Sequence, residues 1–227
     1  GDIGVEMDLS EVPIMQKQII EKCYLRGKPV ITATQMLESM IEQPIPTRAE
    51  ASDVANACFD LTSAVMLSGE TAIGRDPTLV VKTMATIVRK VEERLDYDKI
   101  LLKTHDRRRN VFKDLTTIVN GNAVSIANEC GAKVLVVVTK TGYSARMMSK
   151  LRPHQPIWAF TYDPVAFHQM ALNWGVHPYM FHEEESFETI VDHIKNVCLE
   201  EDIARRGERI VIVGGLPLGQ QIGRAHV

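Results

Sequence analysis

The sequence predicts an α/β protein made of two domains, each with a mainly parallel sheet. Short β-rich runs alternate with longer amphipathic helices, and the connections between them are short. Such alternation is typical of parallel sheets covered by helices. A charged stretch without clear periodicity, residues 96–115, interrupts the alternation once. We therefore expect a first domain over residues 1–95 and a compact second domain over residues 96–227.

Residues 1–95 contain three strand–helix units in succession. Residues 1–5 have the character of a strand end and its turn, with nothing before them to form the strand. We therefore expect that Gly1 is not the natural start of the protein. Ser10 is placed to cap a helix that has Pro13 in its first turn, and Gly27 is placed to end this helix. A β-rich run over residues 28–33 begins the second unit.

The next two helices have clear start signals. Thr47 and Glu50 have the spacing of a capping box, for a helix that runs to about Asp60. After a strand over residues 64–67, Asp76 and the proline that follows open a longer helix with one apolar face. In the second domain a helix over about residues 116–130 comes first. Further strands are expected at residues 133–138, 157–161, 177–181 and 209–213.

The composition argues against several classes of function. With a formal net charge of -3, the chain has no overall basic field that would attract nucleic acid. The basic run at residues 107–109 is interpreted as a solvated connecting segment. No run of 18 apolar residues predicts a membrane span. The four cysteines lack metal-ligand spacing, which indicates free thiols and a cytoplasmic location.

Three short clusters follow predicted strands, where parallel α/β folds place their functional groups. The first is Gly1 and Asp2, whose carboxylate is a suitable ligand for Mg²⁺, although an ordinary turn is the alternative. The second begins at Thr34, whose hydroxyl could either cap a following helix or bind an anionic substrate; the residues alone leave these readings even. The third, residues 68–72, indicates little by itself.

The loop after the strongest predicted strand of the second domain gathers hydroxyls, backbone amides and one ammonium around a glycine. This composition suits a bound phosphate, although an ordinary strand-to-helix turn with a glycine is the alternative. The candidate phosphate ligands are Thr139, Lys140, Thr141, Gly142 and Ser144.

Five segments occur in the order and spacing found in pyruvate kinases: residues 1–6, residues 28–30 with 33–40, and residues 46–50, 53–57 and 66–72. The block at residues 33–40 is the most specific to that family. The chain therefore resembles the pyruvate kinases, with a weaker likeness continuing through the second domain.

The resemblance implies a fold and an activity. Residues 1–95 would be the last three strand–helix units of a (β/α)₈ barrel, and residues 96–227 the C-terminal α/β regulatory domain. The family transfers the phosphoryl group of phosphoenolpyruvate to ADP in glycolysis, giving pyruvate and ATP, and uses Mg²⁺ and usually K⁺. By motif match, Asp2 is a Mg²⁺ ligand, and the amides of Gly1 and Asp2 hold the substrate carboxylate. Thr34 matches the catalytic threonine that binds the substrate beside the enolate.

The resemblance also implies partners. Arg48 matches an interface residue of the family's homotetramer, although the residues alone indicate an exposed position at the start of a helix. The loop at residues 139–144 matches the site for an effector phosphate, which would be a sugar phosphate or AMP. The family's other catalytic groups, including its phosphoryl-binding lysine and K⁺ ligands, would lie upstream of Gly1. This segment alone is therefore expected to be inactive.

Two other functions stay open at this stage. One is a non-catalytic, phosphate-binding regulatory module, and the other is a different Mg²⁺-dependent barrel enzyme such as a lyase, against which residues 33–40 argue. The sequence also departs from the family pattern in two places. Asp60 is followed by Leu61 where a glycine is usual, which leaves the local turn open. Residues 220–227 lack an expected Thr-Asn pair.

Overall fold

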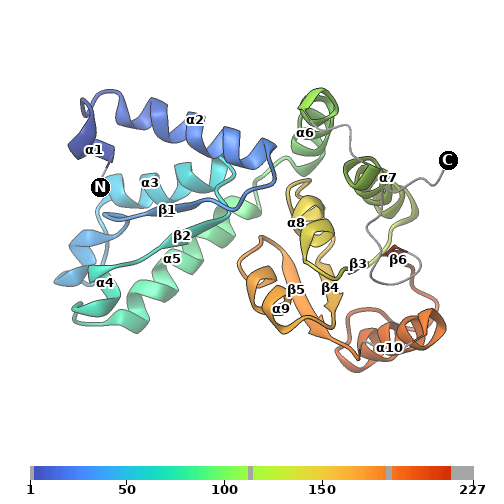
Figure 1. Ribbon diagram of the computed structural model, residues 1–227. Helices are drawn as coiled ribbons and strands as arrows, with labels where there is room; N and C mark the ends of the chain where they lie inside the picture. The colour runs from blue at the N-terminus through green and yellow to red at the C-terminus, as the bar shows by residue number, and fades with distance from the viewer. Residues whose placement is uncertain (1–2, 112–114, 183–185, 216–227) are drawn as a thin grey trace. The chain divides into compact units, whose positions relative to one another are not determined.

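The computed structural model describes residues 3–111, 115–182 and 186–215, and the chain divides into two compact units (Figure 1). Unit 1 is Gly1–Asp96 and unit 2 is Tyr97–Val227. Within the described ranges, no helix combines the length and the apolar character needed to cross a membrane.

Unit 1 contains a sheet of two parallel strands, β1 (Ile31–Ala33) and β2 (Ala64–Met66), in which Ala33 pairs with Met66. Three long helices accompany the strands, namely α2 (Val12–Leu25), α3 (Arg48–Phe59) and α5 (Pro77–Glu92). Three single turns complete the unit: α1 (Ile3–Glu6), the 3₁₀ helix η1 (Glu38–Ile41) and α4 (Gly69–Ala72). The parallel strand–helix order is confirmed, and no closed barrel is formed by the described residues. The strand end expected at residues 1–5 is wrong for residues 3–5, which are helical.

The helix starts of α3 and α5 follow the sequence. Thr47 and Glu50 form the capping box: the Glu50 N–H donates to the Thr47 hydroxyl, and the Thr47 N–H donates to the Glu50 carboxylate. Asp76 caps α5 by accepting a hydrogen bond from the Leu79 N–H at 2.9 Å. A short polar side chain at these positions satisfies N–H groups that have no partner inside the helix.

The predicted cap of α2 is wrong. The helix starts after Glu11, which makes no side-chain cap bond, and the Ser10 hydroxyl instead donates to the Asp8 carboxylate at 2.7 Å. Pro13 does lie in the first turn, and Gly27, with φ of 66°, follows the last turn as predicted. The Asp8 side chain lies only two residues away, so this local bond competes with capping.

The sequence left undecided whether a turn forms after Asp60, and the structure shows that it does. Leu61 adopts φ of 69°, and the N–H of the next residue, Thr62, reaches back to the Ala57 carbonyl at 3.2 Å. This pattern is the usual left-handed ending of an α-helix, in which glycine is preferred. A leucine therefore occupies a backbone conformation that costs L-residues about 1–2 kcal/mol.

Unit 2 contains a four-stranded parallel sheet in the order β5-β4-β3-β6, as the sequence predicted for a parallel domain. The strands are β3 (Val134–Val138), β4 (Ile157–Thr161), β5 (Val176–Met180) and β6 (Ile210–Val213). Each agrees within one residue at either end with a strand predicted from the sequence. The helices are α6 (Tyr97–Val111), α7 (Leu115–Cys130), α8 (Tyr143–Ser149), α9 (Pro164–Met170) and α10 (Phe187–Glu200).

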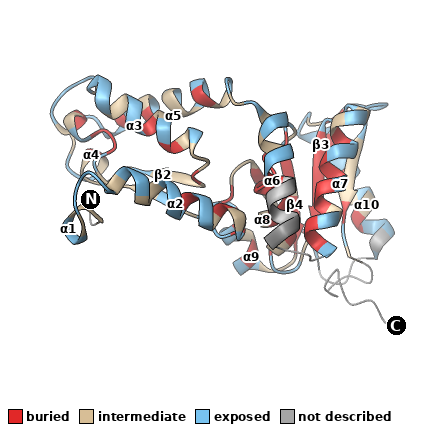
Figure 2. Ribbon diagram, turned by 90° about the horizontal axis from the view of Figure 1, so that it is seen from above, coloured by how far each residue is buried: buried red, intermediate tan, exposed pale blue. Residues whose placement is uncertain are grey.

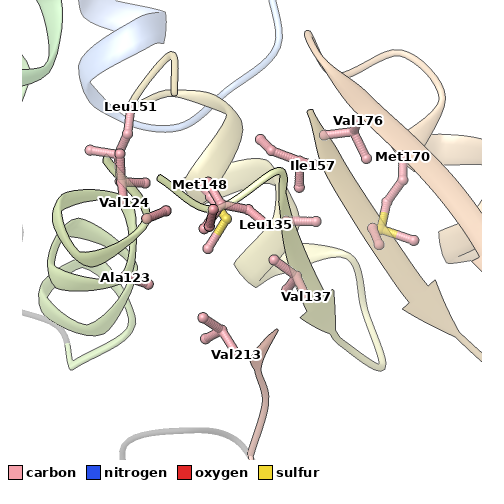
Figure 3. Packing of buried hydrophobic residues seen from close by; sticks show 14 residues of the cluster. Ala123, Val124, Leu135, Val137, Met148, Leu151, Ile157, Met170, Val176 and Val213 are labelled. Carbon is pink, nitrogen blue, oxygen red and sulfur yellow. The ribbon is translucent and has the colours of Figure 1, made fainter. Parts of the chain in front are cut away.

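Both faces of this sheet are covered. Leu135 and Val137 of β3 pack with α7, α8 and α9 in one apolar cluster, whose side chains Figure 3 shows at close range. Val134, Val136 and Val138 point to the opposite face, where they pack with α10. Successive side chains of a strand alternate between faces, so a strand buried on both sides reads as a continuous apolar run. Figure 2 accordingly shows β3 buried along its length.

The charged boundary segment is more ordered than the sequence suggested. Residues 97–111 form α6, although no apolar periodicity predicted a helix there. At its first turn the Tyr97 ring lies 5.0 Å from the His154 ring and 6.0 Å from the Trp174 ring, measured between centroids. Arg152 stacks over Trp174 at 4.5 Å. These ring contacts, rather than helix propensity, anchor the start of α6 on unit 2.

Candidate functional site

The chain enters an unusual conformation directly after β1. Thr34 and Gln35 have φ of 70° and 56°, so two consecutive residues that are not glycine lie in the left-handed region. A β-branched residue such as Thr34 is a rare occupant of this region, and the two non-glycine residues together store strain of a few kcal/mol. Strain of this kind persists only where surrounding contacts hold it, and it gathers at functional sites.

The Thr34 hydroxyl is not a helix cap. Residues 35–37 do not form an α-helix, and η1 begins after Leu37, which makes no side-chain cap bond. Within the described residues the Thr34 hydroxyl has no hydrogen-bond partner, and the side chain is half-buried. The capping role considered for Thr34 is therefore wrong, and its hydroxyl is free to meet a ligand.

A second hydroxyl lies at the same edge of the sheet. Ser68 comes two residues after Met66, the last residue of β2, just as Thr34 follows Ala33, the last residue of β1. Because β1 and β2 are parallel, both side chains come from the carboxyl edge of the sheet, where α/β folds bind their ligands. Sequence reasoning had given no separate role to Ser68.

Glu70 joins the two loops that carry these hydroxyls. Its side chain is buried, with 2% of the residue exposed, and its carboxylate accepts the N–H of Leu37 at 3.1 Å and the N–H of Ser68 at 2.7 Å. Burial alone would raise the pKa of Glu70. The backbone N–H groups that point at the carboxylate outweigh burial and hold its pKa below the usual value. Glu70 is therefore an ionised acceptor at neutral pH.

A second carboxylate, that of Glu50, binds Ser39, two residues after Leu37. The Glu50 carboxylate accepts the Ser39 N–H at 2.7 Å and the Ser39 hydroxyl at 2.5 Å, in addition to its bonds within the capping box. Burial opposes ionisation of Glu50, but these donors at Ser39 and Thr47 lower its pKa to about 2. The capping box was visible in the sequence. The bond to Ser39, which fixes η1 against α3, was not.

Gly1 and Asp2, the predicted carboxylate-binding pair and Mg²⁺ ligand, lie outside the described residues. Among the residues that are described, no group of three or more His, Cys, Asp or Glu side chains could hold a metal ion. Both oxygens of Glu70 are already occupied by backbone donors. The predicted Mg²⁺ ligand Asp2 is thus not among the residues that the structure describes. Arg48, the predicted interface residue, is exposed at the first position of α3.

The candidate phosphate loop of unit 2 connects β3 to α8. Gly142 has φ of 72°, and a Cβ atom placed on it would lie 2.8 Å from Cγ of Met170, so only glycine fits this turn. The hydroxyls of Thr139 and Thr141 have no partner within the described residues. The Lys140 ammonium lies 5.6 Å from the centre of the Tyr162 ring. These three side chains are exposed or half-buried and can reach a ligand.

Ser144 differs from the other members of this loop. Its residue is 6% exposed, its hydroxyl donates to Oδ1 of Asn120 at 3.3 Å, and its carbonyl accepts from Nδ2 of the same Asn120 at 2.9 Å. Asn120 is completely buried in α7. The Ser144 hydroxyl thus ties α8 to α7.

The order of the strands places this loop at a special point of the sheet. From β3 the chain continues to β4 and β5 on one side, and β6 then returns to the other side of β3. Loops on the two sides of such a reversal diverge and leave a crevice beyond the carboxyl ends of the strands, where ligands bind in open α/β sheets. Residues 139–142 follow β3 and Gly214 follows β6, so both bound this position.

Profiles of one protein family match a segment in each of the two units. The family profile of the pyruvate kinase barrel domain matches residues 1–81, and that of the pyruvate kinase alpha/beta domain matches residues 118–224. The chain belongs to the pyruvate kinase family. The resemblance seen in the sequence and the fold class it implied, an incomplete barrel followed by an α/β domain, are thus confirmed.

Individual pyruvate kinases match over nearly the whole chain. That of Clostridium acetobutylicum is 42% identical over 217 residues, which are 96% of this chain and 45% of the relative. That of Bacillus licheniformis is 43% identical over 215 residues, 95% of this chain and 36% of the relative. A crystal structure of a pyruvate kinase from Cryptosporidium parvum superposes with a TM-score of 0.88 at 36% identity, covering 94% of this chain and 43% of that one. The chain thus spans less than half the length of these pyruvate kinases.

Proposed function

We propose that this chain supplies the C-terminal part of a pyruvate kinase, which transfers the phosphoryl group of phosphoenolpyruvate to ADP. The observation that carries the proposal is Thr34: in a member of this family, a strained residue whose hydroxyl has no partner among the described residues lies at the carboxyl end of a barrel strand. Strain without a structural role for the side chain favours a functional one. Phosphoryl transfer depends on positioning and charge neutralisation, and hydroxyls and backbone amides at this edge suit both tasks.

The proposed roles of unit 1 are few. The Thr34 hydroxyl would contact the substrate beside the enolate. The backbone amides of Gly1 and Asp2 would hold the carboxylate of the substrate. Mg²⁺ would supply charge neutralisation for the transferred phosphoryl group, with the Asp2 carboxylate as one ligand. The K⁺ ligands, the phosphoryl-binding lysine and the remaining Mg²⁺ ligands are absent from the segments that match the family motifs. We therefore expect no phosphoenolpyruvate-dependent ATP synthesis from the 227-residue chain alone.

A chimaera tests the catalytic proposal. Residues 1–227 replace the matching segment of the pyruvate kinase from Clostridium acetobutylicum, and ATP formation from phosphoenolpyruvate and ADP is measured. The chimaera is expected to turn over, and its Thr34→Ala variant to lose most of the rate while keeping its far-UV spectrum. Conversely, an isolated 227-residue chain with clear turnover contradicts the assignment of the missing groups to another segment. A folded chimaera without activity contradicts the catalytic roles proposed for residues within the 227-residue chain.

We also propose that the loop at residues 139–144 binds the phosphate of a regulatory sugar phosphate or AMP. The reversal of strand order between β3 and β6 favours this second function, since open α/β sheets bind ligands beyond the strand ends at such a reversal, and the Thr139 and Thr141 hydroxyls, which have no partner within the described residues, follow β3 there. Each charge-assisted bond contributes about 1.5–3 kcal/mol before the cost of association. Lys140 would add an ammonium, and Gly142 would allow the phosphate to approach the backbone closely. Ser144 lies in the first turn of α8, next to this loop.

Titration of the 227-residue chain tests the effector site. Fructose 1,6-bisphosphate, ribose 5-phosphate, glucose 6-phosphate and AMP are added separately, with binding followed by calorimetry and NMR. Thr141→Asp introduces an anion into the loop and is expected to abolish binding. It is a cleaner probe than a change at Ser144, whose hydroxyl is engaged by Asn120. Thr78→Asp, the same change at an exposed position of unit 1, is the matched control. The loop is an ordinary turn if all four compounds leave it unperturbed.

Arg48 leads to a third, smaller proposal, that the complete enzyme is a homotetramer with this residue in a subunit interface. Its exposure at the first position of α3 leaves the guanidinium available to a partner chain. Light scattering on the active chimaera tests it: Arg48→Glu is expected to lower the mass of the assembly. An unchanged tetramer would contradict a role for Arg48 in the interface.

A further inference from the structure

The strained residues of unit 1 are followed at once by a buried anchor. Met36 and Leu37, which come directly after Thr34 and Gln35, are 4% and 0% exposed and pack in the apolar core with Met40, Val54 and Val80. Apolar packing fixes where these side chains lie but not the direction of their peptide groups. The direction of the Leu37 N–H is set by a polar partner, the carboxylate of Glu70.

Glu70 reaches this N–H from a different strand–helix unit, 33 residues further along the chain. Its other oxygen accepts the N–H of Ser68, so one side chain links the loop after β1 to the loop after β2. The backbone joins the same two regions once more, since the Arg75 N–H donates to the Ile41 carbonyl at 3.0 Å. Glu70 is thus a cross-link between the two strand ends that carry hydroxyls.

We propose that Glu70 is the positioning residue that holds Thr34 in its strained, substrate-facing conformation. The assignment rests on the proposed function for its kinetic consequence, but not for its structural one. Glu70 does not itself meet the substrate, because both of its oxygens are directed at backbone N–H groups. Releasing the Leu37 N–H allows residues 34 and 35 to relax toward negative φ, and this moves the Thr34 hydroxyl.

The chemistry of the acceptor makes Glu70→Gln the informative variant. An ionised carboxylate only accepts hydrogen bonds, and Glu70 presents one oxygen to each of two donors. A glutamine has nearly the same size but replaces one oxygen with an NH₂ group, which cannot accept from an N–H. One of the two links must therefore break while the packing is kept. Glu70→Asp keeps the charge on a shorter arm and serves as the second variant where Glu70→Gln does not fold.

Kinetics on the chimaera provide the first test. Glu70→Gln is expected to lower kcat by on the order of 10²-fold, the effect of a displacement of about 1 Å in a catalytic group. The KM for phosphoenolpyruvate should stay nearly constant, since the interaction lost is made in the transition state. In the Thr34→Ala background the same change should cost no further activity, because the two residues act as one unit. Additive losses in kcat would overturn the proposal.

Val91→Ala is the matched control. Val91 is buried in α5 but belongs to neither loop, so its truncation lowers stability without touching the cross-link. Its kcat is expected to equal that of the parent chimaera. If a Val91→Ala variant of the same melting temperature as Glu70→Gln lost activity equally, the effect of Glu70 would be one of stability alone, and the proposal would fail.

Amide exchange provides a test that needs no activity. In the 227-residue chain, Glu70→Gln should accelerate hydrogen exchange at the N–H of Leu37 or Ser68 by about tenfold or more, the equivalent of one charge-assisted hydrogen bond. Val91→Ala should leave these two amides at their parental rates relative to the rest of unit 1. Unchanged exchange at both amides refutes the cross-link even if the chimaera is active. Accelerated exchange together with an inactive parent chimaera leaves the cross-link standing and refutes the catalytic function instead.

Discussion

Replacing Thr34 with glycine is expected to stabilise unit 1 while removing activity. The left-handed conformation at φ of 70° costs an L-residue about 1–2 kcal/mol, and glycine escapes this cost. Glycine in turn loses about 0.5–1 kcal/mol through the greater freedom of the unfolded chain. The Thr34 hydroxyl gives up no hydrogen bond within the described residues. The central balance is a net stabilisation of roughly 0.75 kcal/mol, or about 3–6 °C in the melting temperature of a unit of this size.

The assay separates the two units by their spectroscopic signals. Trp158 and Trp174 are the two tryptophans of the chain, and both lie in unit 2, so tryptophan fluorescence follows unit 2. Far-UV circular dichroism follows both units. For Thr34→Gly, a thermal melt should show a dichroism transition moved upward and a fluorescence transition unchanged. In the chimaera the same variant should lose on the order of 10²-fold in kcat, as expected when a donor beside a developing charge is removed.

Thr47→Ala is the matched control, because it also removes a threonine hydroxyl, but from a true helix cap. It should lower the stability of unit 1 by about 1 kcal/mol. If Thr34→Gly destabilised unit 1 as Thr47→Ala does, the hydroxyl of Thr34 would have a structural role, and the argument from strain to function would be refuted. Full activity of Thr34→Gly would refute the catalytic role directly.

Three further results are expected. Because the pKa of Glu50 falls from 4.5 to about 2 on folding, its carboxylate stabilises the chain above pH 4.5, and this contribution is lost as the pH falls toward 2. Urea unfolding should therefore show Glu50→Gln less stable by about 1–2 kcal/mol at pH 7, after allowance for solvent screening, and nearly equal to the parent near pH 2; a constant difference would contradict this. Gly74→Ala should destabilise unit 1 by more than 1 kcal/mol in the same assay, because the new Cβ atom would lie 2.1 Å from the Glu70 carbonyl oxygen. In the control Gly69→Ala, the new Cβ atom meets only a flexible side-chain end at 3.3 Å, and equal effects of the two variants would refute the clash. Cys198 is buried, which raises its pKa, so a thiol reagent should label the three half-buried cysteines first and Cys198 only on unfolding, as mass spectrometry of the labelled peptides can check.

The features predicted correctly from the sequence are those that depend on near neighbours. The capping box at Thr47, the helix start at Asp76 and Pro77, and the apolar run of β3 each lie within a few residues of the structure they specify. Hydrogen bonds to a helix end and the alternation of side chains along a strand repeat over such short distances. Ser10 shows where this reasoning fails, because an equally local partner, Asp8, competed for its hydroxyl. The charged helix α6 lacked the apolar pattern and was missed.

The candidate site could be predicted only as a set of strand ends. From the sequence, a helix cap and a substrate-binding residue were equally good interpretations of Thr34. Glu70 belonged to the cluster at residues 68–72, which indicated little by itself. The structure excludes the cap, and two facts of tertiary structure support the proposed roles: the left-handed backbone at Thr34 and the bond from Leu37 to a carboxylate 33 residues away. Periodicity specifies which face of an element is buried but not which element covers it. The parallel alignment of β1 with β2 brings the two loops together, and only that contact can hold a conformation that the local sequence disfavours.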